Sequence, residues 1–288
     1  MGDAAPFERF AIIGTGLIGA SFGLAVQRAF PESSITACDR MSVLDKVAER
    51  GWGWKTTTDI SAAVYGADLI YVALPVGATM EALPQIATKC DSRALVTDAG
   101  STKTAICRVA EVEFRSRARF LGGHPIAGKE LSGVEHANAE LFRGARYVLI
   151  GNEHTPDERI QRFSELLRAI GSTLLWFDAE THDWAMAVVS QMPQLAAIAL
   201  AGVIADETDE TGLPLVLAGR GLRDLLRIAG SPYEVWRDIC LTNTENIART
   251  LDRVAQAIDF LRTHLASKEL EGEFRAANEV YKILRDLQ

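Results

Sequence analysis

The sequence predicts an α/β fold with a doubly wound parallel sheet, followed by an all-helical domain. Two observations lead to this class. Up to Asp178, short apolar runs alternate with segments whose apolar residues recur at helical spacing, a pattern that favours parallel strands joined by helices. From Ala179 onward the chain indicates long helices with few strand signals. We therefore place a domain boundary near residue 178, with a sheet domain over 1–178 and a helical domain over 179–288.

The candidate strands are short apolar runs in the first half of the chain. They occupy residues 10–14, 34–39, 67–75, 94–100, 118–123, 145–151 and 172–178. Most of the intervening segments have helical periodicity, and residues 158–171 are amphipathic. This alternation predicts a mostly parallel sheet with helices on both faces, the Rossmann-type arrangement.

Bulk composition restricts the class of protein. The chain has 288 residues and 48% hydrophobic residues, enough for one large domain or two ordinary ones. Its formal charge of −8 argues against a nucleic acid as partner, because a polyanion needs a clustered positive face. The N-terminus lacks a signal-like segment, and no apolar run approaches the ~20 residues of a membrane span. We therefore expect a cytoplasmic protein with no membrane partner.

The cysteines give no sign of a metal or a disulfide framework. They lack CxxC and CxxH spacing, so each is interpreted as a small buried hydrophobic residue. They are Cys38, Cys90, Cys107 and Cys240.

A glycine-rich motif, GTGLIG, lies between the first predicted strand and the first predicted helix. Gly14 allows a tight turn, Gly16 lets a pyrophosphate approach the backbone, and Gly19 lets helix and strand pack closely. The exposed N–H groups of the helix N-terminus, which includes Leu17 and Ile18, then hold the anion. The motif predicts a dinucleotide site.

An acidic residue follows the motif at the spacing of a ribose ligand. Asp39 lies 20 residues after Gly19, at the end of the second predicted strand. A carboxylate accepts hydrogen bonds from a free ribose diol and repels a 2′-phosphate, which favours NAD. Arg40 beside it could accommodate that phosphate, so NADP stays possible.

Two further segments are expected at the carboxyl edge of the sheet, where ligands bind in open α/β folds. ALPV at 73–76 follows the third strand, and its residues Leu74, Pro75 and Val76 are expected to cover the cofactor. DAGSTK at 98–103 follows the fourth strand and adds Asp98, Gly100 and Ser101. Ser101 could equally be a helix N-cap.

His124 begins the stretch HPIAGKELSG, after the fifth predicted strand. At the carboxyl edge it is a candidate general acid or base, near its reference pKa of about 6.5. The alternative is a purely structural histidine.

The segment 184–205 is apolar on most of its circumference. A peripheral helix in water does not tolerate such a surface. The segment is therefore a central helix or one buried by a second subunit, and we expect a homodimer formed through the helical domain.

Four stretches of the chain together resemble the prephenate dehydrogenase family, which includes arogenate and cyclohexadienyl dehydrogenases of tyrosine biosynthesis. They are GTGLIGASFG, DAGSTK, HPIAGKELSG and GLRDLLRIAGSPYEVWRDICLTN. The resemblance implies oxidative decarboxylation of prephenate or arogenate with hydride transfer to NAD. It implies that His124 takes the substrate hydroxyl proton, that Ser101 hydrogen-bonds near it, and that Arg227 binds a substrate carboxylate. Four further residues also match family motif positions, but helix packing or capping explains their presence nearly as well as a role in the site does. They are Glu130, Trp236, Asp238 and Asn243.

The chain departs from the family pattern in its apolar helix. Where many members carry histidines in a Ser-His-Leu-Pro-His pattern, this chain has SQMPQ, which places Gln191 and Gln194 at substrate-binding positions. A glutamine cannot become a cation and binds only by hydrogen bonds. The choice between prephenate and arogenate therefore stays open.

Two other readings share the nucleotide motif. One is a dehydrogenase for β-hydroxy acids or imino acids, which usually depends on a lysine or hydroxyl of its helical domain, and residues 184–205 contain no lysine. The other is a catalytically silent nucleotide-sensing protein, which we expect to lack the set of His124, Ser101 and Arg227.

Overall fold

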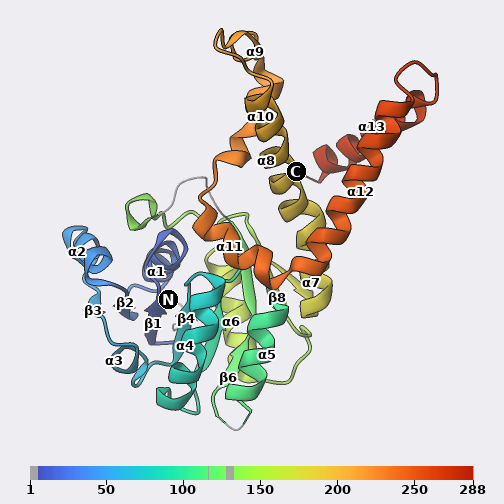
Figure 1. Ribbon diagram of the computed structural model, residues 1–288. Helices are drawn as coiled ribbons and strands as arrows, with labels where there is room; N and C mark the ends of the chain where they lie inside the picture. Colours follow the sequence, from blue (N-terminus) through green and yellow to red (C-terminus); the bar gives the residue numbers. More distant parts are fainter. Residues whose placement is uncertain (1–5, 116, 128–132, 288) are drawn as a thin grey trace.

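Six parallel strands form the main sheet of the computed structural model, which describes residues 6–115, 117–127 and 133–287. The strands lie in the order β3-β2-β1-β4-β5-β6 (Figure 1). The sequence does not predict β3, because its residues KTT provide no apolar run. The six strands are β1 (Arg9–Ile13), β2 (Ser34–Cys38), β3 (Lys55–Thr57), β4 (Leu69–Val72), β5 (Leu95–Asp98) and β6 (Arg119–Leu121).

Helices cover both faces of this sheet, and each face has its own buried core. One core contains Phe22 of α1 and Phe163 of α6, and the other contains Ile86 of α4 and Ile106 of α5. Successive strand residues point to opposite faces, and because helices cover both faces, the central strands β1 and β4 are apolar at almost every position. The helices of this half are α1 (Leu17–Ala29), α2 (Met41–Glu49), α3 (Ile60–Val64), α4 (Val76–Lys89), α5 (Thr104–Glu113), the short η1 (Val134–His136) and α6 (Glu158–Ala169).

A second sheet of three strands lies beside the first. β7 (Gly123–Ile126) pairs antiparallel with β8 (Arg146–Ile150), which pairs parallel with β9 (Thr173–Phe177). The expectation of one doubly wound sheet is therefore confirmed for the six parallel strands and needs this addition. Both sheets share a core, since Tyr147 of β8 packs in the same cluster as Phe22.

The start of β7 corrects the expected position of His124. The sequence predicts one strand over 118–123 and a loop beyond it, but the chain leaves the first sheet at Gly122 and starts β7 at once. His124 lies inside β7, opposite Val148. A Cβ at Gly122 would lie 2.9 Å from Sγ of Cys107, so a glycine suits this crowded change of sheet.

From Ala179 onward the described chain is helical. In Figure 1, α8 and α10 form one arm that rises away from the sheet, with α9 at its tip, and α12 and α13 form a second arm. The elements are α7 (Ala179–Met186), the π-helical η2 (Ala187–Gln191), α8 (Met192–Asp206), α9 (Leu213–Val216), α10 (Arg220–Arg227), η3 (Ile228–Gly230), α11 (Tyr233–Thr242), α12 (Thr244–Thr263) and α13 (Leu270–Asp286).

The stretch Ala179–Asp206 is one helix with a widened turn. Pro193 has no N–H to donate to the carbonyl one turn earlier, and the backbone takes the π turn η2 just before it. By length and composition alone this helix could also cross a membrane. Its sequence is not an unbroken apolar run, because Ser190, Gln191 and Gln194 interrupt it. Within a single chain the helix is little buried.

Three polar contacts fasten the helical part to the carboxyl edge of the main sheet. Asp183 accepts hydrogen bonds from the backbone N–H groups of Lys103 and Thr104 at the start of α5. Asp238 accepts one from the N–H of Gly77 in the first turn of α4, at 3.0 Å. The hydroxyls of Thr102 and Thr242 are 2.7 Å apart. Two carboxylates therefore cap sheet-side helices at their positive ends.

Candidate active site

The glycine motif adopts the conformation that its spacing predicts. Gly14 has a φ of +91°, and a Cβ there would lie 2.5 Å from the carbonyl oxygen of Ala73. A Cβ at Gly19 would lie 1.9 Å from the carbonyl oxygen of Gly14. Among the described residues, no atom lies within 4 Å of a Cβ built on Gly16. Gly14 and Gly19 are thus needed by the fold, whereas Gly16 leaves open space where a ligand can reach the backbone.

A cleft of about 450 Å³ opens at the carboxyl ends of β1 and β4. The order of the sheet reverses there, since β2 follows β1 on one side and β4 lies on the other. Its walls come from both halves of the chain. The sequence-predicted residues that line it are Gly16, Leu17, Ile18, Leu74, Pro75, Val76, Gly100, Ser101 and Trp236.

Asp39 lies beside the glycine turn. Its carboxylate accepts hydrogen bonds from the N–H of Thr15 at 2.7 Å and from the N–H of Arg40 at 2.7 Å. The Arg40 side chain is 85% exposed. Both residues follow β2, so they flank the glycine turn at the position expected for a ribose. The open backbone at Gly16 and this carboxylate fit a dinucleotide.

Asp98 has a different position from the one expected. Its side chain is fully buried and forms an ion pair with Lys103. Its two carboxylate oxygens also accept hydrogen bonds from the N–H groups of Gly100 and Gly123. The carboxylate is thus held by donors of the protein, and its expected contact with the cofactor stays a prediction. It holds the loop that carries Gly100 and Ser101.

His124 is buried, with 8% of its surface exposed, and it is one end of a chain of three side chains. Its Nδ1 lies 2.9 Å from Nε2 of His182, and Nδ1 of His182 lies 2.8 Å from Oδ1 of Asp183. Burial, followed by the nearby side chains of His182 and Lys103, holds the pKa of His124 well below its ordinary value. The imidazole is therefore neutral at physiological pH, which a general base requires.

His124 itself is not among the residues that line the cleft, which the strand of His124 reaches at Ala127. The other expected catalytic and substrate residues have separate positions. Ser101 lines the cleft, but in the described part of the chain it is not hydrogen-bonded to His124. Arg227 ends α10 and is exposed in the single chain, four residues before Ser231 of the cleft wall. Glu130 lies outside the described residues.

Gln191 and Gln194 face inward from the long helix. Gln194 is buried and donates to the carbonyl oxygen of Ile228 at 2.8 Å. Gln191 is 1% exposed and accepts a hydrogen bond from Nδ2 of Asn243 at 2.7 Å. Among the described residues, Nε2 of Gln191 has no hydrogen-bond partner. Gln191 thus keeps one neutral donor for another group.

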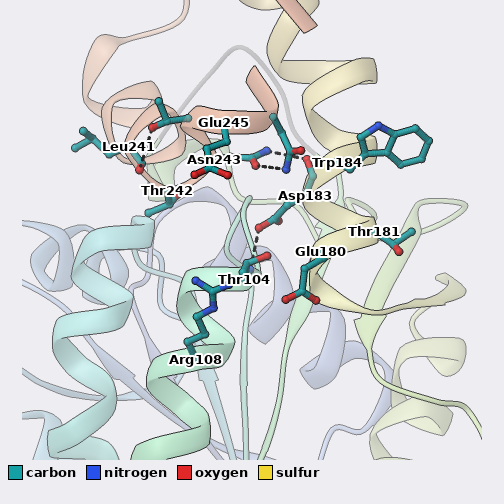
Figure 2. Close-up of a pocket in the computed structure, with 12 residues that line it drawn as sticks. Thr104, Arg108, Glu180, Thr181, Asp183, Trp184, Leu241, Thr242, Asn243 and Glu245 are labelled. Atoms are coloured by element: carbon teal, nitrogen blue, oxygen red, sulfur yellow. Dashed lines mark hydrogen bonds between the residues drawn. The ribbon is translucent and has the colours of Figure 1, made fainter. Parts of the chain in front are cut away.

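A second cavity of about 740 Å³ lies between α5, α7 and the start of α12. Figure 2 shows Asp183 and Asn243 in its centre, with the Asp183 carboxylate directed at Thr104. Arg108 and Glu180 lie on its α5 and α7 sides. This cavity contains Asn243, which matches a family motif position, but none of the residues expected to bind the cofactor or to take the substrate proton, so we place the candidate site at the smaller cleft.

Sequence patterns do not predict the contacts of His182 and Asp183 or the role of Lys103. His182 and Asp183 stand in THDW, just before the apolar helix, where the available signal was a histidine next to a carboxylate in a chain with only five histidines. Lys103 belongs to the DAGSTK segment, yet it is fully buried and forms hydrogen bonds with Asp98 and with the carbonyl oxygen of Gly123. The contacts of His182 with His124 and of Lys103 with Gly123 are not local in sequence.

Comparisons with known proteins match both halves of the chain. Residues 22–175 match the model "Prephenate dehydrogenase, nucleotide-binding domain" and residues 178–279 match "Prephenate dehydrogenase, dimerization domain". Prephenate dehydrogenase of Lactococcus lactis is 32% identical over 96% of this chain and 78% of its own length. Cyclohexadienyl dehydrogenase of Zymomonas mobilis is 29% identical over 91% of this chain and 90% of its own length.

A solved structure extends the likeness to three dimensions. Prephenate dehydrogenase from A. aeolicus, in complex with hydroxyphenyl propionate and NAD+, superimposes with a TM-score of 0.85. It is 27% identical and covers 96% of this chain and 97% of its own. With the nucleotide turn, the cleft between the halves and the buried His124, these matches show that the chain belongs to the prephenate dehydrogenase family.

Proposed function

We propose that this protein is an NAD-dependent dehydrogenase that oxidatively decarboxylates prephenate, arogenate or both. The observation that carries the proposal is a neutral, buried His124 on β7, the strand that leads to Ala127 in the wall of the nucleotide cleft. Family relatives with these activities support it, as does the A. aeolicus structure with NAD+.

The reaction needs groups that hold the cofactor, take a proton and bind the substrate. When bound, NAD accepts the hydride that leaves C4 of the substrate ring. The open backbone at Gly16 and the carboxylate of Asp39 hold the cofactor's pyrophosphate and ribose. The carboxylate at C1 leaves as carbon dioxide, and its bonding electrons make the ring aromatic. The aromatic product supplies the driving force.

His124 acts on the hydroxyl at C4. It accepts the hydroxyl proton as the hydride leaves, and it returns a proton to the phenol oxygen when the ring is aromatic. Ser101, in the cleft wall, hydrogen-bonds the same hydroxyl. Arg227 binds a substrate carboxylate through its guanidinium fork. Trp236 forms an apolar wall for the ring.

The substrate side chain lies toward the long helix. Gln191 is locked by Asn243 with its oxygen occupied, so it presents a neutral N–H donor. Such a donor binds a pyruvyl carbonyl or a carboxylate, and it does not repel the ammonium of an alanyl side chain as a cation would. The residues therefore allow both substrates.

Turnover with the two substrates tests the function. Purified protein is mixed with NAD and either prephenate or arogenate, and the absorbance of reduced cofactor is followed. His124→Asn should keep NAD binding and lower turnover by roughly 10²–10⁴-fold, the usual contribution of a general base. His154→Asn, at an exposed histidine, is the matched control. No reduced cofactor with either substrate would refute the proposal.

We also propose a cytoplasmic homodimer, formed through the helical half, with the domain boundary at residue 178. Exposed apolar side chains on α8, α9 and α13 support the dimer, since water disfavours such surfaces. They are Ile198, Leu200, Val203, Leu213, Leu215, Val216, Phe274, Val280, Tyr281, Ile283 and Leu284. The family match of this half to a dimerization domain supports it further. We propose no nucleic acid and no membrane as partners.

A further inference from the structure

The side chains of His124, His182 and Asp183 form an unbroken line of hydrogen bonds inside the protein. The ring nitrogens of the two histidines are 2.9 Å apart, and the second histidine is 2.8 Å from the carboxylate. The exposed fractions are 8% for His124, 2% for His182 and 1% for Asp183. Water therefore does not compete for these bonds.

The Asp183 carboxylate, at one end of the line, only accepts hydrogen bonds and donates none. Burial alone would raise the pKa of Asp183, but hydrogen bonds from His182, Thr104 and Lys103 outweigh it and hold the pKa below its usual value. An ionised carboxylate has only acceptor oxygens. Its partner on the histidine side, Nδ1 of His182, must therefore carry a proton.

That proton determines the roles of the remaining nitrogens. A neutral imidazole protonated at Nδ1 has a lone pair at Nε2. Nε2 of His182 is then the acceptor, and Nδ1 of His124 must be the donor of the bond between the rings. Neutral His124 consequently carries its proton on Nδ1 and has its lone pair on Nε2.

We propose that His182 and Asp183 are positioning residues that hold His124 in the Nδ1-protonated tautomer, so that its Nε2 is the nitrogen that takes the substrate proton. The proposal rests on the proposed function for the identity of the reaction. Neither residue touches substrate; both act through His124. The same carboxylate–imidazole logic operates in hydrolase triads, where an aspartate fixes the tautomer of the catalytic histidine.

The helical half of the chain sets this tautomer. Asp183 and His182 belong to α7, whereas His124 belongs to β7. The N–H groups of Lys103 and Thr104, at 2.7 and 2.8 Å, hold the Asp183 carboxylate (Figure 2). Nδ2 of Asn243 donates to the Asp183 backbone carbonyl at 2.7 Å. The base is therefore correctly protonated only when α7 is docked on α5.

Spectra of ¹⁵N-histidine-labelled protein test the tautomer directly, independently of turnover. With His124→Asn to assign the signal, wild-type His124 should show a protonated Nδ1 and an unprotonated Nε2. The opposite tautomer in the wild type overturns the proposal. If the wild type turned over neither substrate, the proposed function would fall, and this spectrum would still decide the tautomer.

Two substitutions at His182 separate positioning from packing. The amide oxygen of His182→Gln can accept from Nδ1 of His124 while its NH₂ donates to Asp183, whereas His182→Leu can do neither. We expect turnover of the glutamine variant to exceed that of the leucine variant by at least about a hundredfold, the scale of a general base. Equal turnover of two folded variants, checked by circular dichroism, contradicts the proposal.

Asp183→Asn removes the charge at the end of the line. Both oxygens of Asp183 also accept backbone N–H groups, Oδ1 from Lys103 and Oδ2 from Thr104, so an amide NH₂ meets another donor in either orientation and the proton on Nδ1 of His182 is no longer fixed. We expect turnover to fall by up to roughly 10⁴-fold, as for the equivalent change in a hydrolase triad, and the His124 spectrum to show both tautomers. A folded variant with wild-type turnover and a single Nδ1-protonated His124 overturns the proposal.

Discussion

Lys103 and Asp98 form an ion pair in which neither side chain is exposed to solvent. Nζ of Lys103 also donates to the carbonyl oxygen of Gly123 at 2.7 Å, and Asp98 accepts from the N–H of Gly123 at 3.1 Å. The pair therefore binds both the N–H and the carbonyl oxygen of Gly123, the residue before His124. A buried pair of charges anchors the first residue of β7 to the end of β5.

Breaking this pair should destabilise the protein. Lys103→Met leaves the Asp98 carboxylate buried without its cation, which typically costs about 3–5 kcal/mol of the free energy of unfolding. Urea denaturation measures this loss. Lys89→Met, at an exposed lysine at the end of α4, is the matched control and should change the free energy by no more than about 0.5 kcal/mol. A similar small change for Lys103→Met would contradict a role for the pair.

The pH dependence of turnover should reflect the lowered pKa of His124. Because burial and neighbouring charges favour the neutral imidazole, the base stays available below the ordinary histidine value of about 6.5. We expect kcat/KM to remain on its plateau as the pH falls through 6.5 and to decline only at lower pH. A profile with an acid limb at 6.5 or above would show that His124 titrates as an exposed histidine does.

The same residue should make stability depend on pH. Its pKa is lower in the folded than in the unfolded state, so the unfolded state binds more protons between the folded value and about 6.5. The free energy of unfolding should therefore decrease as the pH falls through that window, and less so in His124→Asn. Asp183, whose pKa is also lowered, contributes stability that is lost only below about 4. Melting temperatures of both proteins across pH 4–8 measure the difference.

Alanine substitutions at two glycines of the nucleotide turn, Gly16 and Gly19, should have different effects on stability and on NAD binding. Gly16→Ala meets no described atom, so the variant should fold normally and bind NAD at least about tenfold more weakly, a loss of 1.4 kcal/mol. Gly19→Ala drives a Cβ into the backbone of Gly14 and should lose about 1–3 kcal/mol of stability. Thermal melts and fluorescence titration with NAD separate the two effects. Unchanged NAD affinity in Gly16→Ala would argue against a pyrophosphate at this turn.

Cofactor preference should depend on Asp39. Asp39→Asn removes the charge that repels a 2′-phosphate but keeps an acceptor for the N–H of Thr15. The ratio of kcat/KM with NADP to that with NAD should rise roughly 10- to 100-fold, or about 1.4–3 kcal/mol. Arg40→Ala should move the ratio the other way, because it removes the exposed cation beside the site. An unchanged ratio in both variants would place the ribose elsewhere.

The dimer should depend on the apolar surface of α8. Sedimentation of the wild type should give twice the 31.3 kDa of one chain. Val203→Glu places a charge on a side chain that is 59% exposed in the single chain, and the mass should fall to that of a monomer. Tyr65→Glu, on the sheet half and 85% exposed, is the control that stays dimeric. A wild-type mass of one chain at all concentrations would refute the dimer.

The sequence determined the features that depend on local spacing. The glycine turn needs backbone freedom at Gly14 and close packing at Gly19, and both requirements appear as residue types within one motif. Helix α6 and the long apolar helix follow from periodicity alone. The cleft residues Leu74, Pro75 and Ser101 were predicted because the carboxyl ends of parallel strands share one edge.

Only the tertiary structure decided which side chains meet. His124 and His182 are 58 residues apart, and Lys103 meets Gly123 across a change of sheet that no periodicity predicts. Whether Asp98 faces a ligand or a buried lysine likewise depends on how two loops pack. Periodicity states which face of a strand or helix is buried, because burial repeats along the chain. It does not state what that face touches, because long-range contacts are determined by the packing of elements that are distant in sequence.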